Sequence, residues 1–380
     1  MRITKSHILK LLTASLLLFT MGRYAAMAQE LTMPERWEKP LRHVRPIFRQ
    51  DTLTICIFGD IMMHSAQISK AGKSDGEYDF SPYFELLEDR IREADIAVAN
   101  MEFTLSGEPY TGYPCFSAPD TLASYLADCG FDVFLAANNH IFDKGAKGAE
   151  RTIGVYRSLA ESMGIRFTGI AGNAEELKAN NPLMIRRKGI SIALINLTYG
   201  TNLGLGTSWP KTNYIGEKDK NAEAFATARS NGADYIIALP HWGPEYQLKH
   251  SKSQEETARW LTGHGADFII GAHPHVVQDT VTIGNTPVAY SLGNAVSNMS
   301  AANTQLELMA TIRIVRQENG DLTALPMELD YLWCSRPGGF REEYTVIPVK
   351  DYIGRPEEWH GRHDYDKMKS TYDRVRKVTE

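Results

Sequence analysis

The sequence has 380 residues, of which 43% are hydrophobic and 23% charged, and a formal net charge of −5. This composition is typical of a globular protein with a full core, and the length suits one large domain or two ordinary ones. Because the longest basic run is only Arg186-Arg187-Lys188, the sequence argues against nucleic acid or an anionic membrane as the main partner. We expect a small molecule or a polymer end instead.

The N-terminus has the pattern of a secretory signal peptide. Basic residues come first, then an apolar run from Ile8 to Met21, then small residues up to Ala28. This pattern predicts cleavage after Ala28, which removes residues 1–28 and leaves residues 29–50 as a lead segment. The apolar run is short for a membrane span and no cysteine follows it. We therefore expect a periplasmic or secreted protein without a stable membrane anchor after cleavage.

The four cysteines lack the C-x-x-C spacing of a zinc or redox motif. Cys56 lies within an apolar strand pattern, and the cysteines resemble small buried hydrophobic residues. Export permits disulfide bonds, so the sequence leaves a bridge between Cys115 and Cys129 open.

Apolar runs that end in polar residues alternate with amphipathic patterns of helical period along most of the chain. In chain order, the sequence predicts strand 52–60, helix 80–93, strand 94–100, helix 119–130, strand 131–138, helix 148–163, strands within 184–197, helix 218–230, strand 234–243, helix 254–264, strand 267–275 and strand 287–294. This βαβ series predicts an α/β fold with a largely parallel sheet that is covered by helices.

The C-terminal part has a different pattern. Residues 306–333 predict an antiparallel hairpin that turns at Glu318-Asn319-Gly320 and is appended after the α/β part. The last residues form a charged amphipathic helical pattern. We expect one domain over 51–333 and a C-terminal extension, 334–380, packed on it.

Polar residues gather at the predicted strand ends, where loops of open α/β sheets converge and bind ligands. Two residues i and i+2 just past a strand point the same way, as in the H-P-H of His273 and His275. Each residue also has an ordinary explanation as a turn, cap or loop residue. The candidates are Asp60, Asn100, Glu102, Asn138, Asn139, His140, Asp143, His241, Trp242, His273, His275 and Asn294.

A metal site is excluded only if every one of these candidates is an ordinary turn, cap or loop residue. Oxygen and imidazole groups at five successive strand ends suit divalent ions such as Mn, Fe or Zn. A carboxylate at Glu102 is suited to bridging two such ions. His140, next to a candidate ligand, is suited to donating a proton to a leaving group. The sequence therefore predicts one or two divalent ions.

Six motifs, taken in order, resemble one known family: FGDIMM, ANMEFTLSG, AANNHIFDKG, LPHWGPEY, GAHPHVVQ and YSLGN. Over residues 52–298 the chain resembles the CapA family of capsule synthesis proteins, associated with poly-γ-glutamate. That family is similar to the calcineurin-like metallophosphoesterases. The resemblance implies a four-layer αββα sandwich of metallophosphoesterase type, here with a C-terminal antiparallel hairpin and helix.

The resemblance also implies roles for individual residues. Asp60 resembles the first aspartate ligand, Glu102 the bridging acid, and Asn139 with His140 the pair of ligand and catalytic imidazole. His241 and His273 resemble ligands of a second ion, and His275 resembles a ligand of the first. The remaining candidates come from their positions at or near the predicted strand ends, and we expect them to bind substrate or support the site: Asn100, Asn138, Asp143, Trp242 and Asn294.

Two positions depart from the metallophosphoesterase pattern. The usual D-x-H opening has Met62 as its third residue, and a thioether is a poor ligand for hard ions. His64 replaces it only if the loop bends unusually. The bridging acid is Glu102 rather than an aspartate. The first metal position therefore lacks one of its usual ligands, whereas the second keeps all of its expected ligands, Asn139, His241 and His273.

Two functions remain open at this stage. The ligand set and the spare imidazole of His140 favour an exported metal-dependent hydrolase that cleaves a phosphoester or amide in an envelope polymer or a small γ-glutamyl substrate. The missing D-x-H histidine favours a non-catalytic accessory protein that binds the polymer during capsule synthesis or export. Fold analogy alone does not separate them.

Overall fold

The computed structural model describes residues 52–204 and 208–380. The predicted signal peptide, 1–28, and the lead segment, 29–50, lie outside the described residues. No helix within the described residues is long and apolar enough to span a bilayer.

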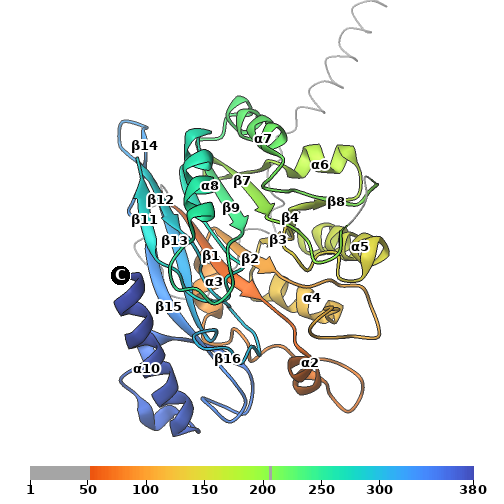
Figure 1. Cartoon of the computed structure of the whole chain (residues 1–380), viewed down its shortest axis with the longest axis vertical. Helices are drawn as coiled ribbons and strands as arrows, with labels where there is room; N and C mark the ends of the chain where they lie inside the picture. Colours follow the sequence, from red (N-terminus) through yellow and green to blue (C-terminus); the bar gives the residue numbers. More distant parts are fainter. Residues whose placement is uncertain (1–51, 205–207) are drawn as a thin grey trace, which may run out of the picture. The chain divides into compact units, whose positions relative to one another are not determined.

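The main elements of the first half come in this order: β1 (Thr52–Ile61), α2 (Ser65–Ala71), α3 (Glu88–Glu93), β2 (Ile96–Met101), α4 (Asp120–Cys129), β3 (Val133–Leu135), α5 (Gly145–Met163), β4 (Arg166–Thr168), β5 (Ile170–Ala171), α6 (Ala174–Asn180), β6 (Leu183–Arg187) and β7 (Ile190–Thr198). The second half continues with β8 (Lys211–Thr212), α7 (Lys218–Ser230), β9 (Tyr235–His241), α8 (Lys252–Gly263), β10 (Phe268–Ile270), β11 (Thr280–Ile283), β12 (Thr286–Ala289), β13 (Leu306–Arg316), β14 (Leu322–Ala324), β15 (Glu328–Ser335), β16 (Thr345–Pro348), α9 (Val349–Tyr352), η2 (Pro356–Glu358) and α10 (Arg362–Thr379) (Figure 1).

Most described strands belong to two mixed sheets. The larger sheet has the order β16-β15-β13-β1-β2-β3-β4, with β14 beside β13, and the smaller has the order β11-β12-β10-β9-β7-β6. The β1–β4 and β7–β9–β10–β12 runs are parallel. Strands β13, β15 and β16 pair antiparallel on the other side of β1, and β6 and β11 pair antiparallel at the two edges of the smaller sheet. The predicted parallel strands thus form one side of the larger sheet and the centre of the smaller one.

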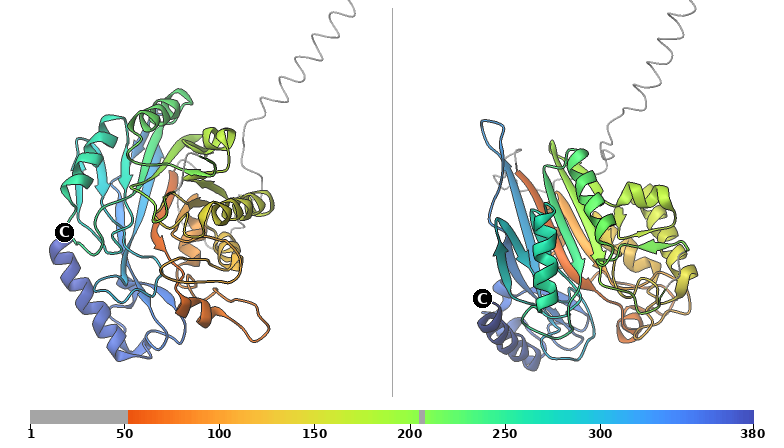
Figure 2. Two further views of the ribbon diagram at one scale, coloured as in Figure 1. Left: turned by 45° about the vertical axis from the view of Figure 1, so that its right-hand side comes forward. Right: turned by 45° about the horizontal axis from the view of Figure 1, so that its top comes forward.

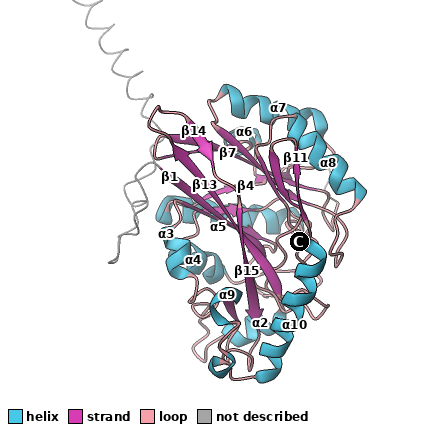
Figure 3. Ribbon diagram, turned by 90° about the vertical axis from the view of Figure 1, so that its left-hand side faces the viewer, coloured by secondary structure: helices cyan, strands magenta, loops and turns pink. Residues whose placement is uncertain are grey.

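The two sheets pack face to face, with helices outside each (Figure 3). The strands alternate their side chains between two cores, as a period of two requires. In β1, Ile55 and Ile57 face the smaller sheet, while Cys56 and Phe58 face the layer of α3, α4 and α5. Helices α7 and α8 cover the other face of the smaller sheet. This is the expected four-layer αββα sandwich.

The C-terminal region is part of the sandwich rather than an addition to it. Strand β13 pairs antiparallel with β1 in the middle of the larger sheet, so the hairpin is not appended at an edge. The boundary expected at 333/334 falls inside β15, and β16 pairs with β15 up to Pro348. Helix α10 buries Tyr365 and Met368 in the core between the sheets, beside the blue strands in both views of Figure 2.

Other local differences from the sequence prediction are small. The helix expected over 80–93 is helical only over 88–93, because turns occupy the residues before it. In the described part of the chain no disulfide bond joins Cys115 to Cys129.

Two glycines fix the end of β1. The backbone N–H of Asp60 donates to the carbonyl of Gly293 over 2.9 Å, and a Cβ on Gly59 would lie 2.0 Å from the same carbonyl oxygen. Only glycine at position 59 lets this loop approach the strand closely.

We predict that Gly59→Ala lowers the free energy of unfolding by about 2 kcal/mol or more, because backbone must move to admit the methyl group. The matched control is Gly154→Ala in α5, where a Cβ meets no atom within 4 Å. That change should stabilise the protein by roughly 0.5–1 kcal/mol, since alanine is the better helix former. Urea denaturation measures both variants, and equal stabilities would refute the constraint.

Candidate functional site

The predicted site residues converge where parallel strands of both sheets end. Strands β1, β2 and β3 bring Asp60, Glu102 and the 138–143 segment from the larger sheet, and β9 and β10 bring His241 and the His273–His275 loop from the smaller one. Residues His241 and Ala272 pair across this end of the smaller sheet. The site is therefore built between the two sheets, at strand ends, as open α/β proteins place ligands.

Asp60 is a buried carboxylate with several donors. It accepts hydrogen bonds from Asn100 Nδ2 at 2.6 Å and from the backbone N–H of His273 at 3.2 Å, and its Oδ2 lies 3.2 Å from His275 Nδ1. Burial alone would raise the pKa of Asp60, but the hydrogen bonds from His275 and Asn100 and the electrostatic influence of the nearby imidazoles more than offset it, so the pKa lies below its ordinary value.

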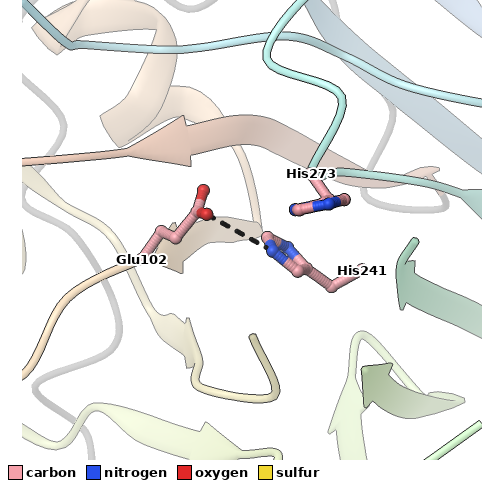
Figure 4. A group of neighbouring side chains, drawn as sticks. All are labelled: Glu102, His241 and His273. Carbon is pink, nitrogen blue, oxygen red and sulfur yellow. Dashed lines mark ion pairs between the residues drawn. The ribbon is translucent and has the colours of Figure 1, made fainter. Parts of the chain in front are cut away.

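Glu102 is buried without any such support. Its Oε1 lies 3.4 Å from His241 Nε2 (Figure 4) and 3.8 Å from His275 Nε2, and neither carboxylate oxygen has a hydrogen-bond partner among the described residues. Burial, followed by the nearby charge of Asp60, raises the pKa of Glu102 well above its ordinary value. A buried unpaired carboxylate is costly, and a bound cation is what would favour its charged form.

Burial favours the neutral form of two of the histidines, and the neutral imidazole is the form that binds metals. Burial lowers the pKa of His241 to about 3 and that of His273 well below its ordinary value. His273 Nδ1 has no hydrogen-bond partner in the described structure, although its side chain is 3% exposed. His241 Nε2 lies 2.8 Å from Asn139 Oδ1, so Asn139 is close enough to share a ligand position.

Three groups of side chains have ligand atoms that all lie within 4.8 Å of one another. The groups are Glu102, His241 and His273; Asp60, Glu102 and His275; and Glu245, His273 and His275. Glu102 belongs to the first two, so it joins two positions in the way a bridging carboxylate does. The oxygen and imidazole donors fit divalent Mn, Fe or Zn.

His140 lies beside these groups with one ring nitrogen held in place. Its Nδ1 lies 2.6 Å from Asp143 Oδ2 and 3.2 Å from Asn202 Nδ2, and the ring of Phe116 packs edge-on at 4.7 Å. Asp143 is 4% exposed and also accepts from the backbone N–H of Phe116. Asp143 thus orients His140 from the Nδ1 side and leaves Nε2 for a reacting group.

The other predicted supporting residues hold the loops. Asn138 accepts from the backbone N–H of His140 and donates to the carbonyl of Met101. Asn294 Oδ1 lies 2.9 Å from His275 Nδ1, a contact that fixes the imidazole. Trp242 is buried and donates from Nε1 to the carbonyl of Tyr290 at 2.9 Å, so it supports the loop and does not line the site.

The structure gives no ligand role to Met62 or His64. Met62 is buried in an apolar cluster, and its thioether is a poor ligand for hard ions. His64 precedes α2, and its Nδ1 lies 3.1 Å from Gln67 Oε1 and accepts from the backbone N–H of Asn298. The loop after β1 therefore does not bend to bring His64 to the position of the missing histidine.

Three residues at or near the site were not among the predicted ones. Glu245 joins one group, Asn202 contacts His140, and Glu307 on β13 accepts the backbone N–H of Gly59 at 2.7 Å. Burial raises the pKa of Glu307 well above its ordinary value. Glu307 could have been recognised as a candidate from the sequence, because it is a carboxylate at an inward-facing position of the otherwise apolar strand LELMATI. Glu245 and Asn202 lie in loops, where polar residues are ordinary.

The sandwich and its clustered oxygen and nitrogen ligands define an α/β protein with a candidate metal centre. The chain belongs to the bacterial capsule synthesis protein PGA_cap family, whose family model matches residues 52–299.

Two relatives carry capsule names. The chain is 25% identical over 308 residues to the capsule biosynthesis protein CapA of Bacillus anthracis, covering 77% of this chain and 72% of the relative. It is 25% identical over 315 residues to the PGA biosynthesis protein CapA of Bacillus subtilis (strain 168), covering 80% and 75%.

Solved structures with a likeness to this one include two nucleotidases. The 5′-nucleotidase precursor of Thermus thermophilus is 12% identical with a TM-score of 0.43, covering 87% of this chain and 60% of that one. The NAD nucleotidase of Haemophilus influenzae is 14% identical with a TM-score of 0.45, covering 85% and 66%. This chain thus spans less than two thirds of either solved chain.

Proposed function

We propose that the protein is a divalent-metal-dependent hydrolase that cleaves a phosphoester or an amide in the metabolism of capsule, poly-γ-glutamate or another envelope polymer. The observation that carries the proposal is Glu102, which is buried between His241 and His275 with both carboxylate oxygens unpartnered among the described residues. A carboxylate in that position suits two cations better than it suits a protein core. The names of the CapA relatives supply the polymer context.

Each residue has a defined task in this proposal. Asp60, Glu102 and His275 would hold one ion, and Glu102, His241, His273 and Asn139 would hold the other. When bound, the ions supply a nucleophilic water at neutral pH and neutralise charge on the displaced oxygen.

In this proposal His140 donates a proton to the leaving group. Asp143 fixes the ring at Nδ1 over 2.6 Å, so Nε2 is the atom that donates. Asn202, within 3.2 Å of the same nitrogen, restricts the ring further. The buried surroundings keep bulk water away from this proton.

A second candidate is a non-catalytic accessory protein that binds the polymer during capsule synthesis or export. Two observations favour it. Both relatives are named for biosynthesis, and Met62 occupies the position of a metal-ligating histidine. Tyr199 and Tyr246 are 50% and 42% exposed, with ring centroids 4.6 Å from His273 and 6.3 Å from His275, and offer a polymer two aromatic faces.

We predict that His140→Asn keeps the metal content of the protein but lowers kcat by about 10²- to 10⁴-fold, the usual contribution of a positioned proton donor. Elemental analysis and hydrolysis of p-nitrophenyl phosphate, bis-p-nitrophenyl phosphate and γ-glutamyl-p-nitroanilide provide the readouts. The matched control is His264→Asn, at the exposed end of α8, which should retain full activity.

Unchanged turnover in the His140 variant would remove the histidine from the mechanism. A metal-loaded wild type that hydrolyses none of these substrates would favour the accessory role.

We also propose that the protein is exported. The support is the sequence of residues 1–28, with its basic start, apolar run and small residues before Gln29. Expression in the native host should place the protein in the periplasm or the medium, and N-terminal sequencing should begin at Gln29. A cytoplasmic protein that retains residues 1–28 would contradict export.

A further inference from the structure

The first metal position has fewer ligands than the second. Three side chains, Asp60, Glu102 and His275, are available to the first position. The second position has Glu102, His241 and His273, and also Asn139, whose Oδ1 lies 2.8 Å from His241 Nε2. The side chain that would complete the first position in a D-x-H motif is Met62, which is buried in an apolar cluster and whose thioether is a poor ligand for hard ions.

We propose that Glu245 supplies a further carboxylate ligand to the metal centre beside His273 and His275, from the loop after β9, in place of the ligand that the loop after β1 lacks. This inference rests on the proposed metal-dependent function. Glu245 forms a group with His273 and His275 whose ligand atoms all lie within 4.8 Å. Its side chain is exposed while both imidazoles are buried, so the carboxylate approaches the metal site from the solvent side.

Backbone hydrogen bonds hold the Glu245 loop against the histidine loop on both sides. The N–H of Trp242 donates to the carbonyl of Ala272 at 3.0 Å, and the N–H of Tyr246 donates to the carbonyl of Pro274 at 2.9 Å. Glu245 lies between these two contacts, so the backbone of its loop is held close to the histidine loop.

The backbone on both loops is strained. Tyr246, His273 and His275 have φ values of 63°, 96° and 59°, in the left-handed region that non-glycine residues rarely adopt. Such conformations persist where the surroundings enforce them, and they cluster at ligand sites. Three strained residues around one carboxylate and two imidazoles indicate a built site rather than a chance approach of an exposed glutamate.

Among the described residues no lysine or arginine forms an ion pair with Glu245, and Lys249 in the same loop pairs with Asp279 instead. Glu245 hydrogen-bonds the side chain of Tyr246, and the buried Nδ1 of His273 has no hydrogen-bond partner in the described structure. A divalent cation satisfies the imidazole nitrogen and the carboxylate at once.

The test is calorimetric titration of the metal-free purified protein with Mn²⁺, comparing wild type, Glu245→Gln and a matched control, Glu223→Gln, at an exposed position of α7. We expect wild type and control to bind two ions alike. In Glu245→Gln the weaker of the two sites should lose about ten-fold or more in affinity, at least the cost of disturbing a supporting contact, while the tighter site is unchanged.

The outcomes separate the two levels of the proposal. Two ions bound with equal affinity by wild type and Glu245→Gln would overturn the role of Glu245 and leave the metal centre intact. A wild type that binds no Mn²⁺ would overturn both. Because Glu245 is exposed, thermal denaturation of the metal-free variants should show equal melting temperatures, which ensures that lost affinity reflects the ligand and not the fold.

Discussion

The buried carboxylate of Glu102 is the feature on which the rest of this site depends. A carboxylate at zero exposure needs donors or a cation, and Glu102 has no hydrogen-bond donor among the described residues. Its neighbours do not compensate, because Asp60 repels it and burial keeps His241 neutral. The protein thus concentrates carboxyl groups and neutral imidazoles where a simple core would place apolar side chains. In the proposed metal centre, divalent cations would stabilise this costly arrangement, and their binding energy would become part of the folding energy.

The two sheets make this arrangement possible. Asp60 and Glu102 come from the larger sheet, and His241, His273 and His275 come from the smaller one, so no single sheet holds a complete ligand set. The apolar core between the sheets sets their separation, and the close approach of Gly59 to Gly293 sets the depth of the first aspartate. Strain is found in the loops, in residues such as His273 and His275. A rigid frame therefore carries the strained loops at its edge, which is how precise ligand positions are maintained.

Much of this was predictable from local patterns, and the exceptions have physical reasons. Helix α7 begins and ends at the predicted residues, Lys218 and Ser230, because its apolar face and flanking polar residues are both local signals. The place of β13 beside β1 was not predictable, since a hairpin pattern specifies its own turn but not the strand with which it later pairs. Glu245 was missed for a similar reason. Its role depends on backbone contacts to residues about thirty positions away, and one exposed loop glutamate in a sequence looks like any other.

The most direct measurement is elemental analysis of the purified protein after Mn²⁺ loading and desalting, with Glu102→Gln and Asp60→Ala alongside wild type. If Glu102 bridges two positions, wild type should hold about two ions per chain, Asp60→Ala about one, and Glu102→Gln almost none, because the bridge serves both ions. A wild type without metal, or a Glu102→Gln variant that still holds two ions, would contradict the account.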